Sequence, residues 1–327
     1  MGKSSPKTRK FEDSYISKIL LLHSGKLALL NLDKIEIISK ETLKIEMIIS
    51  LDSMKDLYQI SNSDLIIISD TGFTVLSLKE NNQYEIKQKI RIESSINIEK
   101  LIEINNKLYI FGLNKDNNPI INIYQKINSN SKEFYQHITL FKIPFYYFFF
   151  YVEYLDVTKE ILLLYQTLIF IDIKTYKINH EIKNQHLYLT GIKDAICILN
   201  ENLVLIACHA GFYFLNAKLH QIVTYVKLEN KIKMLKMFKK DLNGNIIVIA
   251  DDFEDKEEHL MTHYFFIVYK CDNNCKLTKI YEKTTTDRYI DFVCLDKNQI
   301  AFSMSYFPFF SGDEKNYIKI SNFVFKS

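Results

Sequence analysis

The chain has 327 residues, of which 47% are apolar and 25% charged, a composition that excludes a disordered protein and can supply a large core. Its 42 Lys and Arg residues against 39 Asp and Glu residues leave a net charge of +3, which is too small for a protein whose main partner is a polyanion. Only Arg9, Arg91 and Arg288 carry guanidinium groups, so planar contacts to phosphates or guanine edges have few donors. We therefore expect no nucleic-acid partner.

The N-terminal segment is polar and basic, and it lacks the apolar stretch of a signal peptide. We expect residues 1–10 to form a disordered basic tail and residues 11–327 to form a single domain. The five cysteines are odd in number and widely spread, which favours reduced thiols. We expect a cytoplasmic protein, with the nucleus as the alternative. The cysteines are Cys197, Cys208, Cys271, Cys275 and Cys294.

A polar turn followed by a short apolar run recurs seven times along the chain. The successive spacings are 38, 43, 53, 42, 43 and 54 residues, and four of them lie close to the ~40–45 residues of a four-stranded propeller blade. A second apolar run precedes each marker and a third follows it, and most units add a fourth. The pattern predicts an all-β, seven-bladed propeller with four antiparallel strands in each blade. The markers begin at Leu27, Leu65, Leu108, Ile161, Leu203, Ile246 and Ile300. The units span about residues 15–53, 54–94, 95–143, 144–185, 186–230, 231–284 and 285–327.

Glycine and proline are scarce, with 8 and 4 residues respectively. Turns must therefore be built from Asn, Asp and Lys, since Asn and Asp are the other residues that best tolerate left-handed conformations.

An unbroken aromatic run occupies residues 145–151. The apolar stretch between Lys142 and Glu153 has only ten residues, about half of what a membrane-spanning helix needs. We expect no stable membrane insertion and interpret the run as the first, channel-side strand of the fourth unit, buried on both faces. A stacking platform or a membrane-surface patch is the alternative.

The sequence LIFIDIKTYKI at residues 168–178 resembles the third strand and following turn of a WD40 repeat, with Asp172 and Thr175 at the family's positions. Residues 35–45 form a fainter copy that carries Thr42. The repeats lack the family's Trp and Gly-His pair, so the resemblance is to a degenerate WD40-like propeller, and kelch-like or other seven-bladed propellers stay open. The resemblance implies closure by strands from both chain ends. Because the seventh unit is one strand short, we expect the segment around Phe11 to supply the outermost strand.

Two connections between the second and third strands are unusually long. The second and third strand markers lie 8 residues apart in units one and two, but 19 and 18 apart in units six and seven. The two long connections should leave the same face of adjacent blades, and one is acidic while the other is aromatic. We expect them to bind a partner, although the rings could fold back on the blade and the acidic residues could be solvated only. The predicted partner-binding residues are Asp251, Asp252, Glu254, Tyr306, Phe307, Phe309 and Phe310.

Signatures of catalysis or cofactor binding are absent from the sequence. The spacing of His259, His263, Cys271 and Cys275 superficially resembles a zinc site. A strand of about seven residues would separate the two pairs by roughly 23 Å. We therefore expect no metal, no cofactor and no catalytic residues.

The charges on the predicted channel strands are Lys55, Asp56, Glu103 and Lys236, and they form no converging set. We expect a non-enzymatic scaffold that binds other proteins as a subunit of a larger assembly. The alternative is an enzyme or small-ligand binder that uses the central channel.

Overall fold

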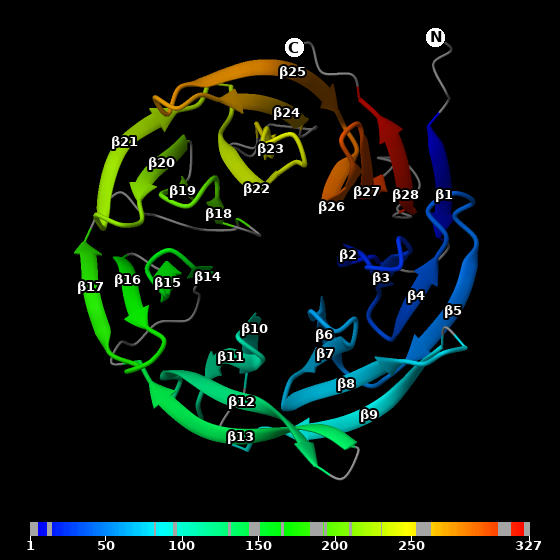
Figure 1. Cartoon of the computed structure of the whole chain (residues 1–327). Helices are drawn as coiled ribbons and strands as arrows, with labels where there is room; N and C mark the ends of the chain where they lie inside the picture. The colour runs from blue at the N-terminus through cyan, green and yellow to red at the C-terminus, as the bar shows by residue number, and fades with distance from the viewer. Residues whose placement is uncertain are drawn as a thin grey trace.

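The computed structural model describes residues 6–11, 15–81, 83–93, 97–129, 132–143, 151–164, 167–183, 192, 195–208, 211–229, 231–252, 263–306 and 315–323. These residues form 28 strands in seven four-stranded antiparallel sheets. The sheets are the blades of a ring around a central channel (Figure 1). The predicted seven-bladed propeller is therefore confirmed. The described residues contain no helix that could span a membrane.

Each blade runs from a channel-side strand to an outer strand. Blade one has β2 Lys18–Leu21, β3 Leu27–Leu30, β4 Lys34–Ile38 and β5 Ile45–Ser50. Blade two has β6 Met54–Gln59, β7 Leu65–Ser69, β8 Gly72–Leu78 and β9 Tyr84–Arg91. Blade three has β10 Asn97–Ile104, β11 Lys107–Leu113, β12 Pro119–Ser129 and β13 Lys132–Lys142. Blade four has β14 Tyr151–Leu155, β15 Glu160–Leu164, β16 Thr167–Asp172 and β17 Ile178–Lys183.

The remaining three blades repeat this order. Blade five has β18 Ile196–Ile198, β19 Leu203–Cys208, β20 Gly211–Asn216 and β21 Gln221–Lys227. Blade six has β22 Met234–Lys240, β23 Ile246–Asp251, β24 Tyr264–Cys271 and β25 Leu277–Thr285. Blade seven has β26 Arg288–Asp296, β27 Gln299–Tyr306 and β28 Lys315–Asn322, and its outer strand is β1 Lys7–Phe11.

The N-terminal strand closes the ring, as the resemblance to WD40 repeats implies. In β1, Lys7 pairs with Ile320 and Phe11 with Asn316 of β28, and the two strands lie side by side in Figure 1. The expected tail of residues 1–10 is therefore too long, because the strand starts at Lys7 rather than near Phe11. Its side chains hold the neighbouring blade as well, since Arg9 Nη1 donates to the Leu43 carbonyl at 2.6 Å.

The core lies between the blades because each blade is covered on both sides by its neighbours. The second strands β3, β15 and β23 are buried at every residue, whereas the outer strand β21 alternates between exposed and half-buried residues. Separate apolar clusters fill successive joints. One cluster joins blades one and two through Ile37 and Leu76, and another joins blades six and seven through Phe266 and Phe302.

Asp and Asn side chains build many of the turns. Asp172 Oδ1 accepts hydrogen bonds from Thr175 N at 2.6 Å and Thr175 Oγ1 at 2.9 Å, in the turn on which the resemblance to WD40 repeats rests. In blade one the same role falls to Ser39, whose Oγ accepts from Thr42 N at 3.2 Å. The left-handed conformation is adopted by more residue types than expected. Only three of the ten described non-Gly residues with positive φ are Asn. Asp and Asn therefore act mainly as side-chain acceptors.

The aromatic run is described only at its last residue. Tyr151 begins β14, the channel-side strand of blade four, where it pairs with Leu164. Residues 145–150, for which a core strand was predicted, lie outside the described residues.

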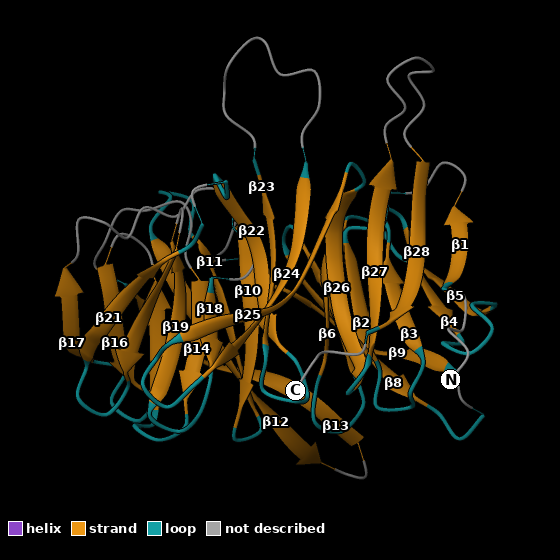
Figure 2. Ribbon diagram, turned by 90° about the horizontal axis from the view of Figure 1, so that it is seen from above, coloured by secondary structure: helices purple, strands orange, loops and turns teal. Residues whose placement is uncertain are grey.

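The ring has two unlike faces, both visible in Figure 2. Connections between second and third strands, and those from one blade to the next, end at one face, which we call the loop face. Turns between first and second strands and between third and fourth strands lie at the opposite face, which we call the turn face.

Candidate functional site

The two long connections leave the loop face from adjacent blades. The connection in blade six joins Asp251 to Tyr264, which pair across β23 and β24. The connection in blade seven joins Tyr306 to Lys315, which pair across β27 and β28. All four strand ends lie at the loop face (Figure 2). This agrees with their position between second and third strands.

The two blades that carry these connections are packed together by aromatic rings. Phe266 of blade six meets Phe302 of blade seven edge-on, with ring centroids 5.3 Å apart. The Phe323 ring lies against Phe266 as well, at 4.9 Å. Such aromatic pairs stabilise beyond the area that they bury, so the bases of the two connections are held at a defined separation.

Asp252 and His263 form a hydrogen-bonded pair, here called the clasp, at the base of the connection in blade six. Asp252 accepts hydrogen bonds from the backbone N of His263 at 2.8 Å and from His263 Nδ1 at 2.9 Å. Both side chains are partly exposed. The clasp holds the two ends of the intervening acidic sequence together, so that Asp252 serves the loop's geometry.

Of the other predicted partner-binding residues, the structure describes only Asp251 and the backbone of Tyr306. Asp251 is only 1% exposed, and its carboxylate lies 3.0 Å from Lys236 Nζ on the channel-side strand. The prediction placed it on a binding surface, but it ends a fully buried strand and faces inward. Tyr306 ends β27, and its side chain is not described. Glu254, Phe307, Phe309 and Phe310 lie outside the described residues.

The channel wall carries a charged network that the sequence did not predict. Lys18 of blade one and Asp56 of blade two form an ion pair at 2.5 Å. Burial lowers the pKa of Lys18, while Asp56 opposes this shift, and the charges of Lys100 and Asp291 also act on the ammonium group. Burial favours a higher pKa for Asp56, but the Lys18 charge and hydrogen bond hold the pKa of this carboxyl below its usual value.

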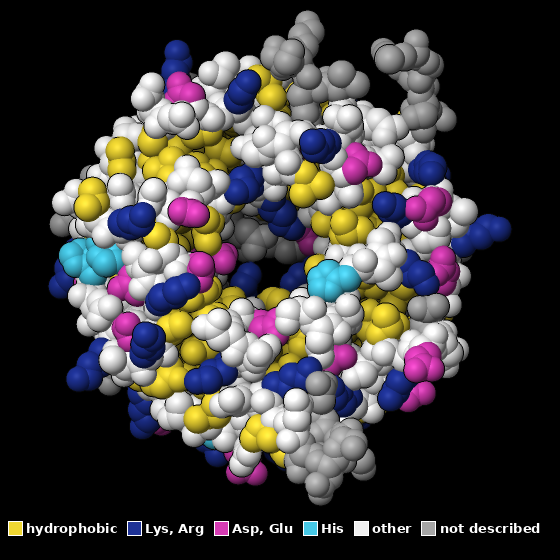
Figure 3. Space-filling view, viewed as in Figure 1, with side chains coloured by type: hydrophobic (Ala, Val, Ile, Leu, Met, Phe, Trp, Pro, Cys, Tyr) yellow, Lys and Arg dark blue, Asp and Glu magenta, His cyan; other side chains and the backbone are white. Residues whose placement is uncertain are grey.

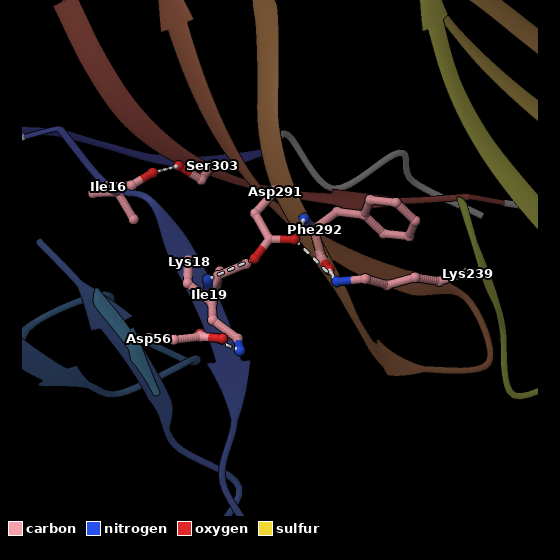
Figure 4. A network of polar contacts seen from close by, with 8 residues as sticks. All are labelled: Ile16, Lys18, Ile19, Asp56, Lys239, Asp291, Phe292 and Ser303. Atoms are coloured by element: carbon pink, nitrogen blue, oxygen red, sulfur yellow. Dashed lines mark hydrogen bonds and ion pairs between the residues drawn. The ribbon is translucent and has the colours of Figure 1, made fainter. Parts of the chain in front are cut away.

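Asp291 is the centre of the same network, shown in Figure 4. Its carboxylate is 1% exposed and accepts hydrogen bonds from Lys239 Nζ at 2.9 Å, from Phe292 N at 2.8 Å and from Ile19 N at 3.0 Å. One side chain of blade seven thus binds blades six and one. Ser303 Oγ adds a second link by donating to the Ile16 carbonyl at 3.0 Å.

Of the four channel charges named from the sequence, only Asp56 belongs to this network, and the other members of the network were not predicted. Lys18, Asp56, Lys100 and Asp291 come from four channel-side strands, and the charges of the other three all act on the Lys18 ammonium group. Asp56 was recognisable in the sequence, but its partner Lys18 lies 38 residues away in another unit, and 272 residues separate Ile19 from Asp291. Alternating Lys and Asp on strands expected to line a channel is the only local signal for such a network.

The other charges named on the channel strands also have structural partners. Lys55 pairs with Asp70 at 2.6 Å and donates to Asn97 of blade three at 2.5 Å. Glu103 accepts hydrogen bonds from Ser61 N at 2.8 Å and Ser61 Oγ at 2.9 Å. The Lys55–Asn97 and Ser61–Glu103 hydrogen bonds connect blades two and three.

Thiol and metal chemistry find little support in the described residues. Burial raises the pKa of Cys271 to about 11 and that of Cys294 to about 12, so both thiols are protonated and poorly nucleophilic at neutral pH. His263 and Cys271 stand at opposite ends of β24, and His259 lies outside the described residues. Within the described part of the chain no group of three His, Cys, Asp or Glu residues could hold a metal ion.

Comparison with known proteins finds similarity in structure alone. No protein-family model matches the sequence, and no curated protein is similar to it at a significant level. The WD40 domain of Neurospora crassa Pan2 superposes with a TM-score of 0.62 at 10% identity, covering 95% of this chain and 91% of that one. Virginiamycin B lyase from Staphylococcus aureus gives a TM-score of 0.60 at 11% identity, covering 97% and 99%. A streptogramin B lyase gives a TM-score of 0.57 at 11% identity, covering 95% and 97%. The chain therefore has the fold of a WD40-like seven-bladed β-propeller.

Proposed function

We propose that this chain is a non-enzymatic scaffold for protein–protein interaction, a subunit of a larger assembly in the cytoplasm or nucleus. Partner proteins bind at the loop face, over blades six and seven. The observation that carries the proposal is that the strands flanking the two long connections between second and third strands end at one face of two adjacent blades. Their sequences supply anchors of the kind found at interfaces, with Phe309 and Phe310 in one and acidic residues in the other.

The channel network supports the same choice. A catalytic site needs titratable groups whose pKa values and positions suit a reaction. Here Asp291 uses its carboxylate to hold backbone N–H groups of two blades and one lysine. Lys55 and Glu103 likewise bind neighbouring blades. These contacts connect neighbouring blades and hold them in fixed positions, as a rigid binding platform requires.

The test is affinity purification of the tagged protein from its native cell, with quantification of every co-purifying chain. The loop variant carries Phe309→Ser and Phe310→Ser. The matched control carries Leu219→Ser and Leu242→Ser, because both leucines are 63% exposed and lie in turns of the turn face. We expect near-stoichiometric partners with the original protein and the control, and their loss with the loop variant at unchanged melting temperature.

Two results would contradict the proposal. Equal capture by the loop variant and the control places the interface elsewhere. A solitary chain in all three purifications removes the scaffold function altogether. A large fall in melting temperature of the loop variant would show that the two rings belong to the core and would withdraw them as anchors.

The second candidate is an enzyme or small-ligand binder that uses the channel. The charges of Asp56, Lys100 and Asp291, which all act on Lys18, favour it, and two of the similar solved structures are lyases. It is tested by thermal shift of the purified chain with inorganic phosphate and small dicarboxylates. A channel site predicts saturable stabilisation that Lys100→Met abolishes, whereas the scaffold proposal predicts no such stabilisation.

A further inference from the structure

A pocket opens at the turn face between blades one and two, on the side of the ring opposite the long connections. Its volume is about 240 Å³. Figure 3 shows this face, where positive and negative side chains are interspersed around the open channel. The pocket is lined by Leu22, Ser24, Lys26, Ile37, Glu46, Met47, Leu78, Asn81, Gln83 and Tyr84.

The inner part of the pocket is apolar and belongs to the joint between the two blades. Leu22 and Ile37 of blade one are each 2% exposed. Met47 is half-buried against the same apolar cluster, and Leu78 is half-buried at the end of β8. The apolar lining therefore continues the core of the joint to the surface, and it is built from two blades whose packing holds its shape.

The rim of the pocket is polar and carries no net charge. Lys26 and Glu46 form an ion pair at 2.7 Å, so their charges cancel. Gln83 N donates to Asn81 Oδ1 at 3.0 Å, and Asn81 Nδ2 donates to Gln83 Oε1 at 3.2 Å, which orients both amides. Among the described residues, Gln83 Nε2 has no hydrogen-bond partner in the chain.

The volume decides which occupant fits. A cavity of about 150 Å³ already holds a benzene molecule, whereas sites for cofactors and drug-sized ligands begin at about 300 Å³. A pocket of about 240 Å³ therefore accepts one large apolar side chain and is smaller than the usual cofactor site. An amide at the rim matches the main-chain carbonyl that flanks such a side chain, and the balanced rim disfavours charged residues.

We propose that this pocket binds a single leucine or phenylalanine side chain of an extended, locally neutral peptide of a partner protein, with Gln83 Nε2 donating to the peptide backbone. The site is distinct from the loop face. A failure here leaves the proposed scaffold function untouched, and the two fail in different experiments.

The probes are N-acetyl-leucine amide and N-acetyl-phenylalanine amide, with N-acetyl-glutamate amide as the charged comparison. The readout is methyl NMR of the full chain with labelled methionine methyl groups, in which Met47→Leu identifies the Met47 signal. We expect the apolar probes to shift the Met47 signal saturably at millimolar concentration. The glutamate probe should bind at least tenfold more weakly.

Leu78→Asp places a charge in the apolar lining and should weaken binding at least tenfold, while Leu242→Asp, at an exposed leucine of blade six, should leave it unchanged. Gln83→Ala, at an exposed position, should weaken binding severalfold and serves as the second variant if Leu78→Asp does not fold. Shifts that spread over several methionines without saturating would overturn the proposal, as would equal binding of all three probes. Unchanged binding by a folded Leu78→Asp chain, or by Gln83→Ala where Leu78→Asp does not fold, would overturn it as well.

Discussion

Asp291 of blade seven lies 2.9 Å from Lys239 of blade six, and its other carboxylate oxygen accepts the backbone N–H of Ile19 in blade one. One buried carboxylate thus joins three blades where the two ends of the chain meet. Because a ring has no free end, loss of one joint weakens the whole domain, and this relationship is the first to test.

Asp291→Ala should lower the free energy of unfolding by about 3 kcal/mol, near the low end of the roughly 3–5 kcal/mol for breaking a buried ion pair. The low end is expected because the Lys239 side chain is 31% exposed and recovers water contacts. Urea unfolding of the variant and the original chain measures the difference. Lys55→Met, at a more exposed pair, is the control and should cost less than about 1 kcal/mol. A loss below 0.5 kcal/mol for Asp291→Ala would show that the carboxylate does not hold the joint.

Phe11→Ala should destabilise the chain by about 3 kcal/mol, because the ring is buried at 8% exposure in the strand that closes blade seven. Lys10→Ala, at an exposed neighbour in the same strand, should change stability by less than about 0.5 kcal/mol. Thermal unfolding of both variants distinguishes loss of packing from loss of the strand itself. Equal effects would mean that Phe11 contributes no packing to closure.

Deletion of residues 1–11 should cause aggregation, because it exposes the unpaired edge of β28. Light scattering during concentration of the purified chain is the measurement. A truncated chain that stays monomeric with an unchanged melting temperature would contradict the role assigned to β1.

Gly72→Ala should cost about 3 kcal/mol through overpacking at the start of β8. An added Cβ there would lie 2.0 Å from the Ile90 carbonyl oxygen, and backbone cannot move away as a flexible side chain does. Gly25→Ala is the comparison, since its Cβ meets open space but its φ is +78°, and it should cost only about 1 kcal/mol. Chemical denaturation that ranks the two in the opposite order would contradict the close approach of β8 and β9.

Asp172 should make stability depend on acidic pH. Its hydrogen bond from the Thr175 backbone lowers the pKa of the carboxyl in the folded chain. A lowered folded pKa means that the ionised carboxylate stabilises the fold above the ordinary Asp pKa of about 3.9, and that this contribution is lost as pH falls through the folded value. Asp172→Asn should therefore have a lower melting temperature than the original chain at pH 7, with the difference shrinking between pH 4 and pH 2. A difference that stays constant over that range would show that the turn does not depend on the charge.

Much of the architecture could be predicted from the sequence because its signals are local. An apolar run of strand length after a polar turn specifies a strand wherever it occurs, and its sevenfold recurrence specifies the number of blades. The closing strand near Phe11 was predicted by counting, since the last unit lacked a fourth strand. The turn of Asp172 and Thr175 was predicted from its own residues, and the same hydrogen bonds are present in the structure.

The tertiary structure alone decided which polar groups meet. Asp251 and Asp252 are adjacent in one acidic stretch, yet the first is buried against Lys236 and the second holds His263 at the surface. Lys18 and Asp291 stand near opposite ends of the chain and reach the same channel wall only because the ring closes. Apolar periodicity is a property of each strand, whereas the partner of a charged side chain depends on how neighbouring blades are stacked, and no single segment of the sequence contains that information.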